Sequence, residues 1–262
     1  MKRTFSSRWM ASSVLAVAAL GLAAPAAMSA DAKDKEKPPL YTFVAGWTLP
    51  RAQWADMEQA AAAAAKVGDK ALAAGTITTF GSDTRLVHLP DTDTHDVWWS
   101  AHSLAGVLNA LDEMFKSGVA MSPALSAATA HSDVIFVSHH YNWKPGTLKN
   151  AYTHGAFYQF KNDAANDSLD VIAQSFIEPM FDKLVADGTL QGYEIDEEAI
   201  HTQNPDGFWL FYISPTAEGL DKVNAALGAA IKANPLVGPA FNRMADSSLH
   251  RDSLFRTNLT IK

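Results

Sequence analysis

The hydrophobic pattern of the chain alternates between strand-like and helix-like segments. Four short segments rich in β-branched and aromatic residues predict strands in the first half: 41–48, 76–80, 97–101 and 133–141. Residues 51–74 are helix formers without proline, and residues 104–116 carry apolar side chains at helical spacing, so each segment predicts a helix. The predicted order is strand, helix, strand, strand, helix, strand.

The second half repeats this order. Strands are predicted at 150–160, 189–195, 208–213 and 252–261, and helices at 167–186 and 216–233. Short sequences recur at matching places: Tyr41-Thr42 as Tyr152-Thr153, Val97-Trp98 as Phe208-Trp209, and His131-Ser132-Asp133 as His250-Arg251-Asp252. We therefore predict two modules, residues 40–145 and 146–262.

The N-terminal segment has a different character. Residues 1–30 combine a basic start (Lys2, Arg3 and Arg8), an apolar run and small residues, which predicts a cleaved secretory signal. The apolar run is shorter than the roughly 20 residues of a membrane-spanning helix. Residues 31–39 are charged and end in proline, so we expect a disordered leader. The expected location is periplasmic or secreted, with no membrane span after cleavage.

Composition restricts the partners and the chemistry. The 262 residues include no cysteine, which excludes disulfides, thiol catalysis and thiolate-bound clusters. The net charge is −7, and removal of a signal with three positive and no negative charges makes it −10. Nucleic acids and anionic membranes require concentrated basic patches, so neither is expected as a partner.

The duplicated order of strands and helices resembles a fused pair of dimeric α+β barrel modules. This superfamily includes small monooxygenase-like, stress-responsive barrel and chlorite dismutase-like proteins. The resemblance implies an α+β fold of two ferredoxin-like (βαββαβ) repeats, in which two four-stranded sheets face each other, with helices outside and a cavity between the sheets. Because one chain would supply both halves, we expect a monomer.

Histidine and aromatic residues on the predicted strands are the candidate site. Side chains alternate along a strand, so only one of His139 and His140 can face the cavity. We place His140 there with His154 and Tyr158, as an acid/base, a ligand anchor or a metal ligand. Three tryptophans are candidate walls for a flat apolar ligand: Trp98, Trp99 and Trp209. The alternative is that all six residues are ordinary core or surface residues.

Two acidic segments contain histidine. They hold Asp91, Asp93, His95 and Asp96 in the first half, and Glu194, Asp196, Glu197, Glu198 and His201 in the second. Carboxylates with imidazole can bind a divalent cation, but the glycine and distal glutamate of a calcium loop are missing. We therefore expect solvated acidic hairpins and assign no metal site.

The functional hypothesis is an exported protein that binds a small apolar or aromatic molecule between its sheets. The sequence lacks GxSxG, HExxH, P-loop and dinucleotide-binding motifs, so no catalytic residue or cofactor is identified. An oxygenase-like enzyme is the alternative, either cofactor-independent or with a haem held by histidine. A structural or interaction module is a further alternative.

Overall fold

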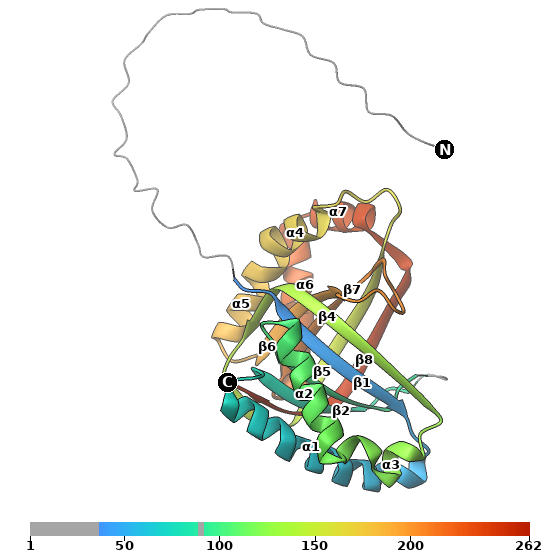
Figure 1. Ribbon diagram of the computed structural model, residues 1–262. Helices are drawn as coiled ribbons and strands as arrows, with labels where there is room; N and C mark the ends of the chain where they lie inside the picture. The colour runs from blue at the N-terminus through green and yellow to red at the C-terminus, as the bar shows by residue number, and fades with distance from the viewer. Residues whose placement is uncertain (1–36, 89–91) are drawn as a thin grey trace, which may run out of the picture. The chain divides into compact units, whose positions relative to one another are not determined.

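The structure, a computed structural model, describes residues 37–88 and 92–262. The predicted signal and most of the predicted leader lie outside the described residues. Eight antiparallel strands form a closed barrel with helices around it, so the protein is an α+β protein (Figure 1). Among the residues described, no helix has both the length and the apolar character needed to cross a membrane.

The strands are arranged in two groups of four around the barrel. Their bounds are β1 Leu40–Thr48, β2 Thr79–Arg85, β3 His95–Ala101, β4 Ala130–Trp143, β5 Gly146–Phe160, β6 Gly192–Glu198, β7 Gly207–Ser214 and β8 Ala245–Ile261. The order around the barrel is β1-β3-β2-β8-β5-β7-β6-β4. Strands β4, β1, β3 and β2 are therefore neighbours, as are β8, β5, β7 and β6, and the pairs β2–β8 and β4–β6 join the two groups.

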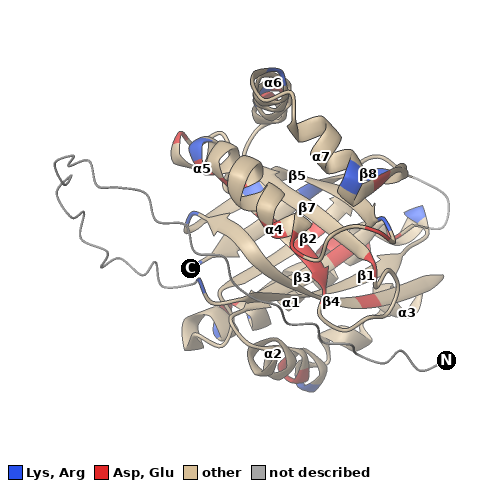
Figure 2. Ribbon diagram, turned by 90° about the horizontal axis from the view of Figure 1, so that it is seen from above, with Lys and Arg blue, Asp and Glu red and all other residues tan. Residues whose placement is uncertain are grey.

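The helices cover the outside of the barrel. They are α1 Trp54–Ala74, α2 Leu104–Ser117, α3 Pro123–Ser126, α4 Ser168–Ile172, α5 Glu178–Ala186, α6 Ala217–Ala233 and α7 Val237–Met244. Figure 2 shows α1, α2 and α3 on one side of the strands and α5, α6 and α7 on the other. The predicted helix at 167–186 is interrupted by a π-helical turn at Ala173–Ile177, and α3 and α7 were not predicted.

Local chemistry explains the ends of α2, the helix that sequence reasoning located best. The Ser103 hydroxyl accepts a hydrogen bond from the Gly106 backbone N–H (3.1 Å), which is the usual N-terminal cap. Gly118, at a φ of 79°, ends the helix in the left-handed conformation that glycine adopts without strain. The predicted helix at 104–116 therefore matches α2 closely.

Alternation along the strands divides side chains between the inside of the barrel and the helices outside. On β3, Trp98 points inward, whereas Trp99 points outward and its Nε1 donates a hydrogen bond to the Val107 carbonyl of α2 (2.9 Å). The Trp99 ring stacks on Phe43 of β1, with 4.7 Å between ring centroids. Opposite faces for these adjacent tryptophans are what the alternation predicts.

A β-bulge changes the facing of β4. The pairing of β4 with β6 shifts register between Ser138 and His140, which leaves His139 as an extra, exposed residue. His140 consequently lies on the outer face, where Asp170 of α4 and Glu178 of α5 bind its ring nitrogens. Neither of the two histidines lines the inside of the barrel.

Candidate functional site

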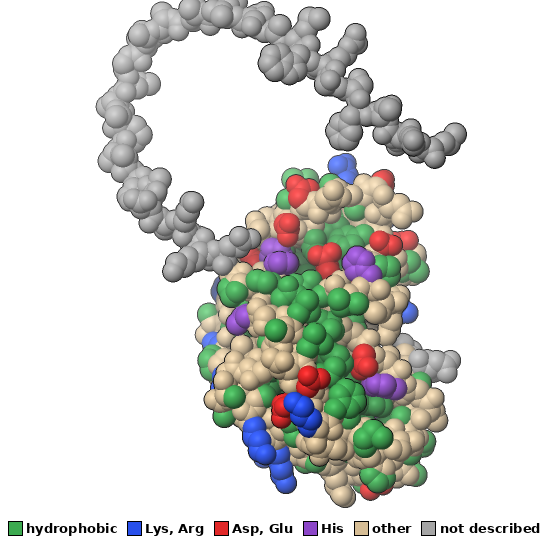
Figure 3. Space-filling view, viewed as in Figure 1, with side chains coloured by type: hydrophobic (Ala, Val, Ile, Leu, Met, Phe, Trp, Pro, Cys, Tyr) green, Lys and Arg blue, Asp and Glu red, His purple; other side chains and the backbone are tan. Residues whose placement is uncertain are grey.

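A cavity of about 620 Å³ lies between the outer face of β1, β3 and β4 and the helices α1, α2 and α3. We call it the helix-side cavity. Its walls are mainly apolar: Phe43, Ala45, Trp47, Met57, Ala60, Ala61, Ala64, Val97, Trp99, Leu111, Met114, Phe115, Val119 and Leu125. The volume falls in the range of small-molecule sites. On the face shown in Figure 3, apolar side chains gather centrally, with histidine and acidic side chains around them.

The alanine run of α1 makes the room for this cavity. Ala60, Ala61 and Ala64 lie on the side of α1 that faces the sheet, and none has side-chain atoms beyond Cβ to fill the space. The large side chains come from the sheet and from α2 instead. The small-residue face of this helix therefore lies against the sheet and leaves a cavity there.

A histidine–aspartate pair supplies polar groups to the lining of the helix-side cavity. His131 and Asp133, at the start of β4, both line it, and His131 Nε2 lies 3.3 Å from Asp133 Oδ2. His131 Nδ1 lies 2.9 Å from the Gly46 carbonyl oxygen. The ring stacks on Trp47, with 5.0 Å between centroids and 11° between planes. These contacts fix the imidazole in one orientation.

The hydrogen bonds determine what this pair can do chemically. A carbonyl oxygen only accepts, so Nδ1 of His131 carries a proton, and Nε2 faces the carboxyl group of Asp133. Nε2 and Oδ2 face each other, so a proton between them can be held by either group. Burial raises the pKa of Asp133 above its ordinary value. The pair can therefore donate or accept a proton beside the apolar cavity.

The second half of the chain reproduces this geometry. His250 Nε2 lies 3.3 Å from Asp252 Oδ2, and His250 Nδ1 lies 2.9 Å from the Phe157 carbonyl oxygen. The His250 ring stacks on Tyr158, the residue after Phe157, just as His131 stacks on Trp47 after Gly46. The repeated His-x-Asp sequence is visible in the chain, but nothing local to it indicates a function.

Two predicted site residues meet at this second pair, on the outer face of the barrel. Tyr158 stacks on His250 with 4.4 Å between ring centroids, and His154 Nε2 lies 3.4 Å from Asp252 Oδ1. Burial raises the pKa of Tyr158 to about 12 and lowers the pKa of His154. The sequence predicted that these side chains lie between the sheets. In the structure, the alternation of side chains along β5 turns them toward the helices of the second half.

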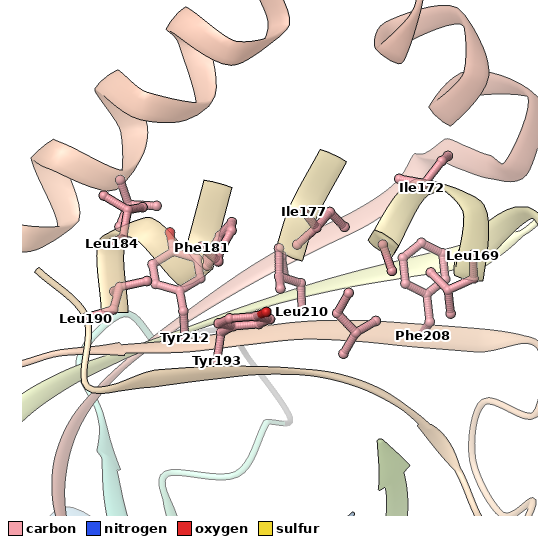
Figure 4. Packing of buried hydrophobic residues seen from close by; sticks show 14 of the residues in the cluster. Leu169, Ile172, Ile177, Phe181, Leu184, Leu190, Tyr193, Phe208, Leu210 and Tyr212 are labelled. Carbon is pink, nitrogen blue, oxygen red and sulfur yellow. The ribbon is translucent and has the colours of Figure 1, made fainter. Parts of the chain in front are cut away.

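Aromatic side chains fill the space between sheet and helices in the second half (Figure 4). Phe181 of α5 packs on Tyr193 and Tyr212, with ring centroids 5.2 and 5.5 Å apart. Phe241 of α7 packs edge-on against Tyr158. These rings occupy the region that corresponds to the helix-side cavity, so the second His-x-Asp pair adjoins a packed core.

The inside of the barrel holds a separate cavity, which we call the barrel lumen. Its volume is about 280 Å³, and Trp98 and Trp209 are the two predicted site residues that line it. Trp99, His140, His154 and Tyr158 face the helices. The six predicted residues therefore lie on both sides of the sheet and form no single site.

Acidic side chains also line the barrel lumen, which differs from the expectation of solvated hairpins. The acidic segments continue β2, β3 and β6, and alternation turns every second side chain inward. In the described part of the chain, five buried carboxyl groups lie on the inner faces: Asp83, Asp96, Glu194, Asp196 and Glu198. Figure 2 shows acidic positions along the strands in the middle of the barrel.

Neither His131 nor His140 is free to ligate a haem iron. In the described part of the chain, His131 is the histidine that lines the helix-side cavity, and its Nε2, the atom that would ligate iron, faces Asp133. Both ring nitrogens of His140 are bound by carboxylates at 2.8 and 2.9 Å. Among the same residues, no group of three or more histidine and acidic side chains is arranged to hold a metal ion.

Comparisons with known proteins identify the fold. No family model matches the sequence, and no curated protein matches it. A candidate monooxygenase from Lactobacillus acidophilus has a TM-score of 0.58 at 12% identity, covering 86% of this chain and 97% of its own. A second, from Fusobacterium nucleatum, has a TM-score of 0.59 at 8% identity, with coverage of 86% and 94%. These neighbours are dimeric α+β barrel proteins of monooxygenase type, and at such identities they show the fold alone.

Proposed function

We propose that the protein binds a small, flat, apolar molecule in the helix-side cavity. The observation that carries this proposal is an apolar cavity of about 620 Å³ with one fixed proton-exchanging pair, His131 and Asp133, in its lining. Ligand sites typically combine apolar walls with a few placed polar groups. The sequence placed the ligand between the sheets, but the larger and more apolar space lies outside the barrel.

The position of the pair selects ligands that carry one polar group. A hydroxyl group on an aromatic ring can reach the His131–Asp133 pair while its ring stays among Phe43, Trp99 and Met114. Burial of the ring supplies most of the affinity, at roughly 25 cal/mol per Å² of apolar surface. The pair supplies orientation, since it can bind either a hydroxyl or its conjugate base.

A second candidate function is cofactor-independent oxygenation. The observation that favours it is the same pair, because transfer of a proton from a bound phenol or enol to the His131–Asp133 pair produces the electron-rich anion that reacts with dioxygen. The monooxygenase-type neighbours agree with this chemistry at the level of fold. The haem-dependent form of the hypothesis is not proposed, because the nitrogens of His131 and His140 that could ligate iron face carboxyl groups.

Two further proposals concern the whole chain. We propose that the halves are diverged ferredoxin-like repeats, supported by the matching strand orders and by the two His-x-Asp pairs. Such a fused pair is expected to be monomeric. Export rests on the composition of residues 1–30. N-terminal sequencing of the protein isolated from the periplasm or medium tests it, and a retained Met1 would contradict it.

The ligand proposal is tested with 2-naphthol, a flat molecule with one hydroxyl group, titrated by its fluorescence. Ala64→Phe adds a ring inside the helix-side cavity, so affinity should fall at least about tenfold. Ala62→Phe is the matched control, since Ala62 lies on the exposed side of α1. The binding proposal fails if wild-type protein leaves the fluorescence of 2-naphthol unchanged, or if both variants bind it equally well.

The proton-transfer role needs a separate readout. Wild-type protein should shift the absorption of bound 2-naphthol toward that of the anion, and dioxygen uptake should accompany this shift if the protein is an oxygenase. His131→Gln keeps a donor for the Gly46 carbonyl but cannot take up a proton. It should therefore bind 2-naphthol without the spectral shift. Unchanged spectra in wild-type and variant protein would leave binding as the function and refute the oxygenase.

A further inference from the structure

The barrel lumen has a lining unlike that of the helix-side cavity. Its walls combine aromatic rings with carboxyl groups, including Trp98, Trp209, Phe136, Asp83 and Glu194. Gly81 makes room for one of these rings, since a Cβ at this position would come within 2.3 Å of the Trp98 indole. Gln203 and Asn204, in the connection between β6 and β7, also line the lumen, so the cavity extends to that end of the barrel.

Three of the inward-facing carboxyl groups have oxygen atoms without a hydrogen-bond partner among the described residues: Asp83, Glu194 and Asp196. Asp83 is only 8% exposed; its Oδ2 accepts from Trp98 Nε1 (3.0 Å), whereas Oδ1 has no partner among the described residues. Glu194 is 6% exposed, and its Oε2 is likewise unpartnered within the described chain. A buried carboxylate oxygen without a partner is costly, which points to a group that completes it.

The arginines of the lumen are engaged elsewhere. Arg85 donates from Nε to the Asp93 carbonyl (2.5 Å) and from Nη1 to Ser253 Oγ (2.8 Å). The guanidinium of Arg251 lies over the Phe157 ring, 4.7 Å from its centroid. In the described part of the chain, neither arginine forms a salt bridge with Asp83 or Glu194 within 4 Å. The lumen therefore carries an excess of acidic groups over available cations.

The aromatic rings favour a particular kind of cation. The rings of Phe136 and Trp209 lie 4.8 Å apart, and Trp98 is held by its hydrogen bond to Asp83. Aromatic faces attract ammonium groups, most strongly where water is excluded. The aromatic walls can also pack against the apolar part of an organic cation. A hydrated metal ion has no such part. A volume of about 280 Å³ limits the occupant to a small molecule.

We propose that the barrel lumen binds a small organic cation, a protonated amine on an apolar or aromatic body, with the ammonium group on Asp83 and the body against Trp98, Phe136 and Trp209. This site is distinct from the helix-side cavity and does not depend on the function proposed for it. Glu194 supplies a second unpartnered acceptor to the same cavity. Asp83 is the anchor because its other oxygen is already fixed by Trp98.

Binding of a cation is coupled to loss of a proton. Burial raises the pKa of Asp83 to about 7 and that of Glu194 to about 7. The charged groups that face Asp83 are Asp96 on β3 and Arg85, and Asp93 lies beside Asp96. On β8 the facing residue is the neutral Thr257, whose hydroxyl group lies beside the Asp83 carboxyl group. A cation at Asp83 favours the carboxylate, so affinity should rise as pH increases through about 7, and protons should be released on binding.

The probe is benzylamine, which stays protonated in this pH range, and its neutral match is benzyl alcohol. Isothermal titration at about pH 8 should show benzylamine binding at least about tenfold more tightly than benzyl alcohol to the lumen site. Asp83→Asn retains the shape and an acceptor for Trp98, and should weaken benzylamine binding at least about tenfold. Asp69→Asn, on the exposed side of α1, is the matched control and should bind as wild type does.

Two further measurements test the lumen site. The first uses wild-type protein alone, so it does not depend on the folding of a variant, and the second separates the lumen from the helix-side cavity. Titrations of wild-type protein in buffers of different ionisation enthalpy should show proton release, with affinity about tenfold lower at about pH 6 than at about pH 8. The Ala64→Phe variant should no longer bind 2-naphthol but should still bind benzylamine with wild-type affinity. Absence of benzylamine binding, equal binding of benzyl alcohol, or wild-type affinity in Asp83→Asn would overturn the lumen site while leaving the helix-side proposal intact.

Discussion

Replacement of Asp83 by asparagine should stabilise the protein at alkaline pH. The pKa of Asp83 rises from an ordinary 3.8 to about 7 because burial disfavours the charged form. Between these values the folded protein holds a proton that the unfolded chain has lost, so the free energy of unfolding falls as pH rises, and it levels off above about 7. The difference between the two pKa values corresponds to about 4 kcal/mol.

Asparagine cannot ionise, yet it keeps an oxygen acceptor for Trp98 Nε1. The variant and wild-type proteins should therefore have similar stability near pH 4, and the variant should gain up to about 4 kcal/mol by pH 8. Part of the pH dependence should persist, because Asp96 is also buried with a raised pKa. Urea unfolding followed by tryptophan fluorescence at about pH 4 and 8 measures this, with Asp69→Asn as control. A variant less stable than wild type at pH 8, or with an unchanged pH slope, would refute the reasoning.

Three other substitutions test the packing. Gly81→Ala should destabilise the barrel by about 1–3 kcal/mol, because its Cβ would meet the Trp98 indole; Gly228→Ala, in α6 with open space around it, should stabilise by about 0.5–1 kcal/mol. Equal effects in urea unfolding would contradict the assigned position of Trp98. His140→Ala should cost about 1–2 kcal/mol, because it leaves two carboxylates facing each other, but should not change 2-naphthol binding. Loss of 2-naphthol binding in His140→Ala would show that His140 contributes to the ligand site.

The sequence located the elements better than it located the side chains. Helix spacing and the capping residues Ser103 and Gly118 define α2 locally, so its bounds could be predicted. The side of the sheet on which His140 lies could not be predicted. It depends on a single extra residue, His139, at which β4 changes register against β6. That pairing joins segments more than 50 residues apart, and no local pattern encodes it.

The acidic segments show a second limit of sequence reasoning. Carboxyl-rich stretches usually lie in solvent, so Asp96, Glu194 and Asp196 were assigned to exposed hairpins. In the structure they alternate along β3 and β6 and lie on the inner face of the closed barrel. Whether an alternating polar face meets water or an enclosed lumen depends on closure of the barrel, which is a property of all eight strands.

The two His-x-Asp pairs show how the halves differ under the proposed duplication. Each imidazole has the same two contacts, one with a backbone carbonyl and one with a carboxylate, and each stacks on an aromatic ring. The two halves differ in the helices that pack against these pairs. Alanines on α1 leave an open cavity beside His131, whereas Phe181 and Phe241 fill the second half. The same pair geometry with opposite packing places the proposed helix-side ligand site in the first half, whereas the corresponding region of the second half is a packed core.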